Sequence, residues 1–203
     1  MIAEQSQLAD RLTRKFPIMA ATPTKQLLQG FTAPEFTLPD MISGKMLSLS
    51  ELRSEKATVI VFICNHCPYV IHIIGELVKV GKDYIPKGVS FVMINSNDVE
   101  AYPADSPELM VEFARKHDFP FPYLYDQTQD VARAYDAACT PDISVFDGNL
   151  KCVYRGQFDD SRPGNDKPVT GADLRQTLDL ILAGQPLPEN QKPGVGCNIK
   201  WKK

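Results

Sequence analysis

The sequence predicts an α/β fold in which a central mixed β-sheet is flanked by helices, with an N-terminal hairpin extension. Residues 58–63 and 89–94 are mainly apolar, as expected of central strands covered on both faces. Between them, apolar residues recur at helical spacing, which indicates a strand-helix-strand crossover. Residues 142–146 and 151–154 flank an Asp-Gly turn and indicate an antiparallel hairpin, so the sheet is expected to be mixed.

Length and composition indicate one domain with appendages. The chain has 203 residues, 43% of them hydrophobic, which suffices for one substantial core. We expect an N-terminal extension over residues 1–29, a single domain over residues 30–184 and a C-terminal tail over residues 185–203.

A small hairpin is expected ahead of the sheet. Residues 33–40 alternate as an edge strand does, and Ser43 with Gly44 turns the chain towards residues 45–49. Ser48 with Glu51 three residues later forms a capping-box signature, which predicts one short helical turn.

Four longer helices are predicted. The first follows the cysteine motif and is expected to end at Gly81. Asp126 with Gln129, and Thr170 with Asp173, have the spacing of N-terminal caps. Together with a Ser-Pro start at residue 106, these signals predict helices over residues 107–117, 126–138 and 170–183.

Composition and charge exclude several classes of function. A net charge of -3 and a pI near 5.6 leave no basic face for nucleic acid. No apolar run approaches the ~18 residues that a membrane span requires, and the N-terminus lacks the apolar region of a secretory signal. Five cysteines are too few, and odd in number, for a disulfide-stapled secreted scaffold. We therefore expect a cytoplasmic protein with no nucleic-acid or membrane partner.

The tetrad Cys64-Asn65-His66-Cys67 is the motif that indicates chemistry. It lies between a predicted strand and a predicted helix, where unpaired N–H groups and partial positive charge favour thiolate. The two cysteines have three interpretations: a redox dithiol, half of a zinc site, or coincidence. Zinc needs four ligands, and the sequence has no second Cys-x-x-Cys or His-x-x-x-His pair, although His66 or His72 could supply a third. We favour the redox dithiol and expect no metal and no cofactor.

The spacing of the two cysteines suits a disulfide. Positions three apart share a helix face, so the two sulfurs can approach the ~2 Å of an S–S bond. A helix end is worth only ~0.3–1 kcal/mol, which moves a thiol pKa by less than about one unit. The helix alone is therefore insufficient to hold a thiolate at neutral pH.

The order of elements, with a reactive pair after the first central strand, resembles the thioredoxin fold. Residues 33–40 (APEFTLPD) resemble the entry segment of the redoxin branch, which contains alkyl hydroperoxide reductases and thiol-specific antioxidants. Further segments resemble the peroxiredoxin-like 1 group of that branch: FICNHCPYV at 62–70, CTPD at 139–142, RGQFDD at 155–160 and GCNIKW at 196–201. The resemblance extends over residues 20–200 and implies a thioredoxin-like fold.

The resemblance implies roles for the motif and for a distant proline. By analogy with thioredoxins, Cys64 is the more exposed, attacking thiol, and Cys67 resolves the mixed disulfide. His66 is expected to support the thiolate by a hydrogen bond or a positive charge, the alternative being an exposed turn residue without a partner. Thr140 and Pro141 stand where thioredoxin-like proteins hold a cis-proline, so we expect the Thr140 backbone to bind an extended substrate segment.

Three cysteines lie outside the motif. Cys139 is expected near the pair, either as an additional redox thiol or as a small core residue. Cys197 resembles a mobile C-terminal resolving thiol, with a buried tail cysteine as the alternative. Cys152 is expected to pack within a strand. Arg155 and the two acids at 159 and 160 are expected in a solvated loop.

The sequence also departs from the related patterns. Thioredoxins carry a buried acid six residues before the first cysteine, where this chain has Thr58. The proton acceptor for Cys67 is therefore missing or comes from elsewhere. Peroxiredoxins carry a threonine three residues before the peroxide-reacting cysteine; aligned on Cys67, that position is Cys64. Efficient peroxidase activity is therefore not expected.

These observations favour a thiol-disulfide oxidoreductase that uses the Cys64 and Cys67 pair. The alternatives are an antioxidant thiol peroxidase and a non-catalytic redox sensor or binding module. The expected partners are a protein or small-molecule disulfide, or a peroxide, as substrate and a thiol as electron donor. The sequence does not predict the oligomeric state.

Overall fold

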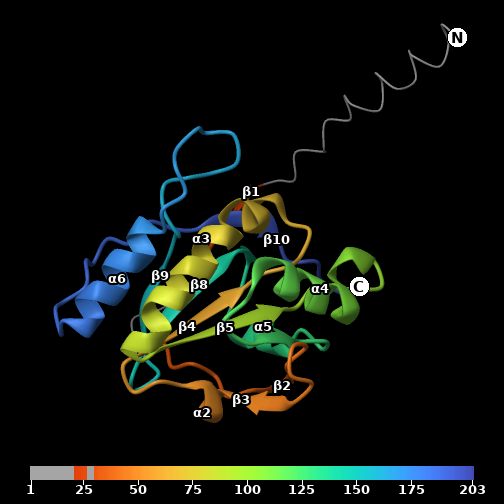
Figure 1. Ribbon diagram of the computed structural model, residues 1–203, viewed down its shortest axis with the longest axis horizontal. Coiled ribbons are helices and arrows are strands. Elements are labelled where there is room, and N and C mark those ends of the chain that lie inside the picture. The colour runs from red at the N-terminus through yellow and green to blue at the C-terminus, as the bar shows by residue number, and fades with distance from the viewer. Residues whose placement is uncertain (1–20, 27–29) are drawn as a thin grey trace, which may run out of the picture.

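The computed structural model describes residues 21–26 and 30–203, and its centre is a five-stranded mixed sheet (Figure 1). The strands lie in the order β6 (Tyr123–Tyr125), β5 (Val89–Asn95), β4 (Ala57–Phe62), β8 (Asp142–Asp147) and β9 (Cys152–Gly156). β4 is parallel to β5, as the strand-helix-strand crossover predicts, and its antiparallel pairing with β8 makes the sheet mixed.

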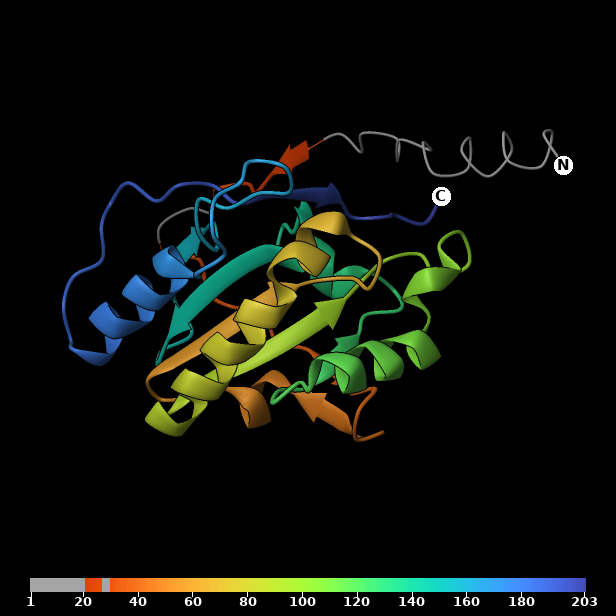
Figure 2. The same ribbon diagram turned by 45° about the horizontal axis from the view of Figure 1, so that its top comes forward.

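Strand β4 is buried along its whole length because both faces of the sheet are covered. Val59 and Val61 face one apolar cluster, to which α3 (Pro68–Tyr84), α4 (Pro107–His117) and α6 (Ala172–Leu182) contribute (Figure 2). Ile60 and Phe62 face a second cluster, formed with residues of the 33–52 segment and of α5 (Asp130–Ala134). Successive side chains of β4 therefore pack alternately into the two apolar clusters, one on each face of the sheet.

The predicted hairpin and its cap are confirmed. β2 (Thr37–Pro39) pairs with β3 (Met46–Ser48), and α2 (Leu49–Leu52) follows directly. The Ser48 side chain accepts from the backbone N–H of Glu51, while the Glu51 carboxylate accepts from the backbone N–H of Ser48.

Helix α3 continues past Gly81, where we expected it to end, to Tyr84 and a short 3-10 turn, η1 (Ile85–Lys87). Gly81 packs against Phe121, whose ring would lie 2.8 Å from an added Cβ. The glycine thus permits close packing and does not end the helix.

Two of the predicted helix starts are wrong. The helix expected over residues 126–138 is the five-residue α5, because Gln129 has a left-handed φ of 67° and residues 123–125 form β6. The buried carboxylate of Asp126 still accepts N–H groups of this helix, at Val131 and Ala132. Helix α6 starts at Ala172 and its N-cap residue is Gly171, so Thr170 lies outside the cap.

A second sheet joins both ends of the described chain to the segment before Pro141. β10 (Val195–Asn198) lies between β1 (Ala21–Pro23) and β7 (Cys139–Thr140), antiparallel to both. Both views place β10 beside the start of α3 (Figure 1, Figure 2). Most of the expected N-terminal extension, residues 1–20 and 27–29, lies outside the described residues.

None of the helices in the described ranges has the length and apolar character needed to cross a membrane.

Candidate redox centre

The cysteine motif lies at the junction of β4 and α3, as predicted. β4 ends at Phe62, Cys67 is the N-cap residue of α3, and Pro68 occupies the first helical position. No side chain caps this helix N-terminus. The Cys67 sulfur therefore lies at the positive end of a 17-residue helix.

Three cysteine side chains meet at this point. The sulfur of Cys67 lies 2.6 Å from the sulfur of Cys197 in β10, and it is also hydrogen-bonded to the side chain of Cys64. The Thr140 carbonyl oxygen is 3.0 Å from the Cys67 sulfur, and the Thr140 hydroxyl is 3.5 Å from the Cys64 sulfur. The centre thus combines the predicted pair with a thiol from the C-terminal strand.

The contacts favour thiolate at Cys67. Burial opposes its ionisation, but hydrogen bonds from Cys197, Cys64 and Thr140 outweigh this and lower the pKa of Cys67. The same hydrogen bonds, together with burial, raise the pKa of Cys64 and of Cys197. Of the three thiols that meet here, Cys67 is therefore the most acidic.

The expectation that Cys64 is exposed is wrong. Cys64 and Cys197 are each 1% exposed, and Cys67 is 0% exposed. β10 lies across the start of α3, and Thr140 contacts both sulfurs of the motif. A hollow of about 20 Å³ beside Pro141 and Val195 is too small for a substrate. Access to the sulfurs therefore requires a covering segment to move.

His66 pairs with an acid that the sequence did not reveal. Asp105, buried at the end of a 3-10 turn, η2 (Pro103–Asp105), places Oδ2 2.7 Å from His66 Nδ1. It also accepts from the Asn65 backbone N–H at 2.8 Å and from the Asn97 amide at 2.8 Å. The hydrogen bond with Asp105 raises the pKa of His66 despite partial burial. The His66 ring is stacked on Tyr102, and its Nδ1 faces Asp105.

Cys64, His66 and Asp105 form a candidate metal-binding group, which tests the zinc interpretation of the motif. One ligand atom each from Cys64, His66 and Asp105 lies within 4.8 Å of the other two, and they are the sole such group found in the described ranges. The group supplies three of the four ligands of a tetrahedral site. The direct contact of His66 with Asp105, and the effect of Asp105 in raising the pKa of Cys64, both disfavour a metal-bound thiolate there.

The Thr140–Pro141 bond is cis, as expected. The chain's own tail, however, occupies the edge where an extended substrate was expected to bind. Cys197 pairs with Thr140 in the antiparallel register of β10 and β7. The strands approach so closely that a Cβ on Gly196 would lie 2.1 Å from the Thr140 carbonyl oxygen. Substrate binding at this edge stays a prediction that requires β10 to be displaced.

Comparison with known proteins places these features in a family. The AhpC/TSA family matches residues 30–158, which is more than half of the chain. The chain belongs to the AhpC/TSA family. An uncharacterized conserved protein of Geobacillus kaustophilus is 58% identical, with 91% of this chain and 97% of that chain covered and a TM-score of 0.89.

Two further structures extend this comparison. A hypothetical protein of Sinorhizobium meliloti 1021 is 44% identical, with a TM-score of 0.87 over 89% of this chain and 98% of that one. The thioredoxin domain of a Bacteroides vulgatus thiol-disulfide oxidoreductase is 18% identical, with a TM-score of 0.58 over 75% of this chain and 99% of that one, and it shares the fold. No curated protein matches. The AhpC/TSA family and the thioredoxin-like fold support a thiol redox function.

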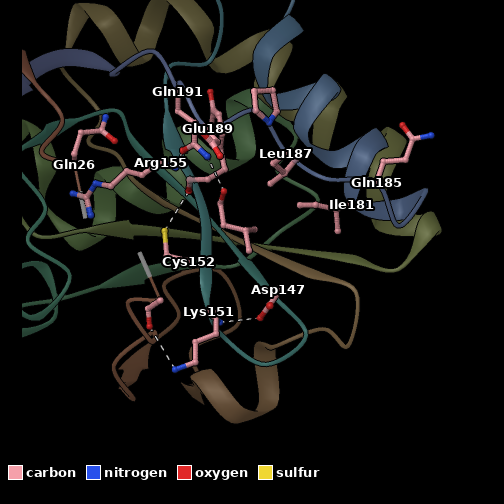
Figure 3. Close-up of a pocket in the computed structure, with 14 residues that line it drawn as sticks. Gln26, Asp147, Lys151, Cys152, Arg155, Ile181, Gln185, Leu187, Glu189 and Gln191 are labelled. Atoms are coloured by element: carbon pink, nitrogen blue, oxygen red, sulfur yellow. Dashed lines mark hydrogen bonds between the residues drawn. The ribbon is translucent and has the colours of Figure 1, made fainter. Parts of the chain in front are cut away.

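The remaining thiols of this AhpC/TSA protein differ in setting. Cys139 is buried, its sulfur donates to the Pro141 carbonyl at 3.5 Å, and burial raises its pKa well above the usual range. Cys152 lines a cavity of about 640 Å³ between β9 and the segment after α6 (Figure 3). Burial raises the pKa of Cys152 to about 11. Neither thiol has the acidity expected of a nucleophile.

Arg155 is not in a solvated loop. It is 3% exposed, its Nη2 lies 3.0 Å from the buried carboxylate of Asp142, and it donates to the carbonyls of Tyr135 and Asp136. In this AhpC/TSA protein the arginine therefore anchors the segment that leads into Cys139. Asp159 is also buried, whereas its neighbour at position 160 is exposed as expected.

Proposed function

We propose that the protein is a thiol-disulfide oxidoreductase whose redox centre contains Cys64 and Cys67, with Cys67 as the attacking thiolate. The observation that carries this proposal is that the sulfurs of Cys64 and Cys197 both contact the sulfur of Cys67, which lies on the N-cap of α3. Two neighbouring thiols and a helix N-terminus together lower the pKa of a thiol further than the helix alone does. This assignment exchanges the roles that the thioredoxin analogy gives to Cys64 and Cys67.

The reaction is a two-step thiol-disulfide exchange. The Cys67 thiolate attacks one sulfur of a substrate disulfide, forms a mixed disulfide and releases the other sulfur as a thiolate. A second thiol of the centre then attacks the Cys67 sulfur and releases the rest of the substrate. The centre ends oxidised by two electrons, and an external thiol restores it. His66 and Asp105 pair with each other beside Cys64, so a protonated His66 offsets the negative charge of Asp105 next to the reacting sulfurs.

The test is reaction of the reduced chain with glutathione disulfide. We expect the wild-type chain to release both halves of the disulfide as free glutathione, and Cys67→Ser to release neither. Cys152→Ser is the matched control, because Cys152 is a half-buried thiol that the hydrogen bonds place outside the centre. A Cys67→Ser chain that reacts at the wild-type rate would refute the proposal.

The family match favours a second candidate, the reduction of peroxides. The Cys67 thiolate would then become a sulfenic acid, and a neighbouring thiol would condense with it to form a disulfide and water. Cys64 stands where peroxiredoxins carry a peroxide-orienting threonine, which argues against a fast reaction. Stopped-flow measurement of the rate at which the reduced chain consumes hydrogen peroxide tests this second candidate. A rate no higher than that of a free thiol at the same pH would exclude it.

A further inference from the structure

Cys197 is held firmly opposite Cys67. Residues 195–197 pair with β1 on one side, and Cys197 and Asn198 pair with β7 on the other. Beyond the strand, the Ile199 N–H donates to Ala138, and the Lys200 carbonyl accepts from the Asp98 N–H and the Gln129 amide. Cys197 is therefore a fixed part of the centre, in contrast to the mobile tail thiol that its sequence resembles.

The sulfur geometry already approaches that of a bond. At 2.6 Å, the sulfurs of Cys67 and Cys197 are about half an ångström farther apart than the ~2.05 Å of a disulfide. The two residues are 130 positions apart in the sequence, so only the tertiary fold brings them together. To form the bond, the two sulfurs must approach each other by about half an ångström.

Electrostatics separate the two thiols that could resolve a mixed disulfide on Cys67. Cys64 lies beside the buried carboxylate of Asp105, which opposes a second negative charge at Cys64. Cys197 lies near Lys200, whose positive charge favours its ionisation. Once Cys67 has lost its charge to the mixed disulfide, these neighbours decide which thiol ionises.

We propose that Cys197 is the resolving thiol and that oxidation of the centre ends as a Cys67–Cys197 disulfide. This assignment rests on the proposed function for its first step, in which the Cys67 thiolate attacks a disulfide RSSR and releases RS⁻. Cys197 then attacks the Cys67 sulfur; the new S–S bond forms, the bond to R breaks, and R leaves as thiolate while the Cys197 proton passes to a released thiolate. Two electrons reduce RSSR to two thiols. An external dithiol later reduces the Cys67–Cys197 bond.

Tryptic mapping of the oxidised full chain distinguishes the two pairings. Cys64 and Cys67 share the peptide between Lys56 and Lys79, whereas Cys197 is in the peptide between Arg175 and Lys200. After treatment with glutathione disulfide, we expect these two peptides to be joined. The link should persist in Cys64→Ser and in the control Cys152→Ser. A link confined to the first peptide in the wild-type chain would overturn the proposal.

Kinetics give an independent test. In Cys197→Ser, the glutathione adduct on Cys67 should outlive that of the wild-type chain by more than about tenfold, because an internal thiol resolves far faster than a thiol from solution. Cys152→Ser, at a thiol outside the centre, should retain the wild-type lifetime. Equal lifetimes in the wild-type chain and Cys197→Ser would contradict the assignment. Near-ultraviolet circular dichroism of the reduced variants, with Cys197→Ala as a second substitution, confirms that the fold is intact.

The proposed function and this pairing can fail separately. If no glutathione adduct forms in any chain, the proposed function fails. Diamide, which oxidises neighbouring thiols directly, then decides the pairing without an exchange step. A link between the two peptides supports Cys197, and a link within the first peptide refutes it.

Discussion

At the scale of single residues, three neighbours set which sulfur of the centre carries charge. The hydrogen bond with Cys67, burial and the charge of Asp105 raise the pKa of Cys64, whereas hydrogen bonds with Cys197 and Cys64 lower the pKa of Cys67. Burial alone would raise the pKa of both thiols, so the hydrogen bonds and the nearby carboxylate distinguish them. His66 pairs with the buried carboxylate of Asp105 and, when protonated, offsets its charge.

Asp105→Asn should lower the pKa of His66. The hydrogen bond with Asp105 raises the pKa of His66 in the folded state. The stability that this pair contributes is therefore complete below the unfolded value of ~6.5 and is lost as pH rises through the higher folded value. In the variant this pH dependence should disappear. Nuclear magnetic resonance titration of the imidazole protons measures the shift, with His117 on α4 as the internal control. An unchanged His66 titration would contradict this account.

At the scale of elements, β10 depends on the absence of a side chain at Gly196. An added Cβ would lie 2.1 Å from the Thr140 carbonyl oxygen, so β10 and β7 could not keep their present spacing. This spacing places Cys197 against Cys67. The reactivity of the centre and the pairing of the C-terminal strand are therefore coupled.

Gly196→Ala should expose the centre. We expect β10 to move away from β7 and the Cys67 thiol to react faster with a maleimide than in the wild-type chain. Gly75→Ala is the matched control, because Gly75 lies within α3 with nothing within 4 Å of an added Cβ, and alanine favours a helix by ~1 kcal/mol. Equal labelling rates in the wild-type chain and Gly196→Ala would show that β10 does not cover the thiol.

The start of α6 gives a second element-scale prediction. The buried carboxylate of Asp159 accepts the N–H groups of Thr170 and Gly171, each at 2.7 Å. Asp159→Ala should lower the free energy of unfolding by about 1–3 kcal/mol, because these donors lose their partner. The control is Asp160→Ala, because the ion pairs of Asp160 with Lys167 and Lys192 are exposed and contribute far less to stability. Urea unfolding measures both, and equal losses would refute the capping role of Asp159.

At the scale of the whole molecule, a Cys67–Cys197 disulfide would join the start of α3 to the C-terminal strand. The bond would close a loop between residues 130 positions apart. On the chain-entropy account, such a loop raises the free energy of unfolding by up to ~5 kcal/mol.

The oxidised chain should therefore unfold at higher denaturant concentration than the reduced chain. The difference should vanish in Cys197→Ser and persist in Cys152→Ser. Urea unfolding with and without a reducing agent provides the measurement. A Cys64–Cys67 bond closes only a short loop and would give a much smaller difference.

The amino-acid sequence by itself determined the sheet, the crossover helix and the position of the motif at the junction of β4 and α3. Those features follow from local patterns: apolar runs, helical periodicity, and caps such as Ser48 with Glu51. The false helix start at Asp126 shows the limit of local signals, because that carboxylate binds helix N–H groups from outside the cap position.

Only the tertiary structure decided the chemistry of the centre. Asp105 and Cys197 lie 41 and 133 positions after Cys64 in the chain, and no local pattern links either to the motif. Sequence periodicity reports which face of an element is apolar, whereas pairing of β10 with β7 depends on how the folded layers meet. The identity of the ionised sulfur follows from those long-range contacts, because the pKa of a buried thiol is set by the few groups that touch it.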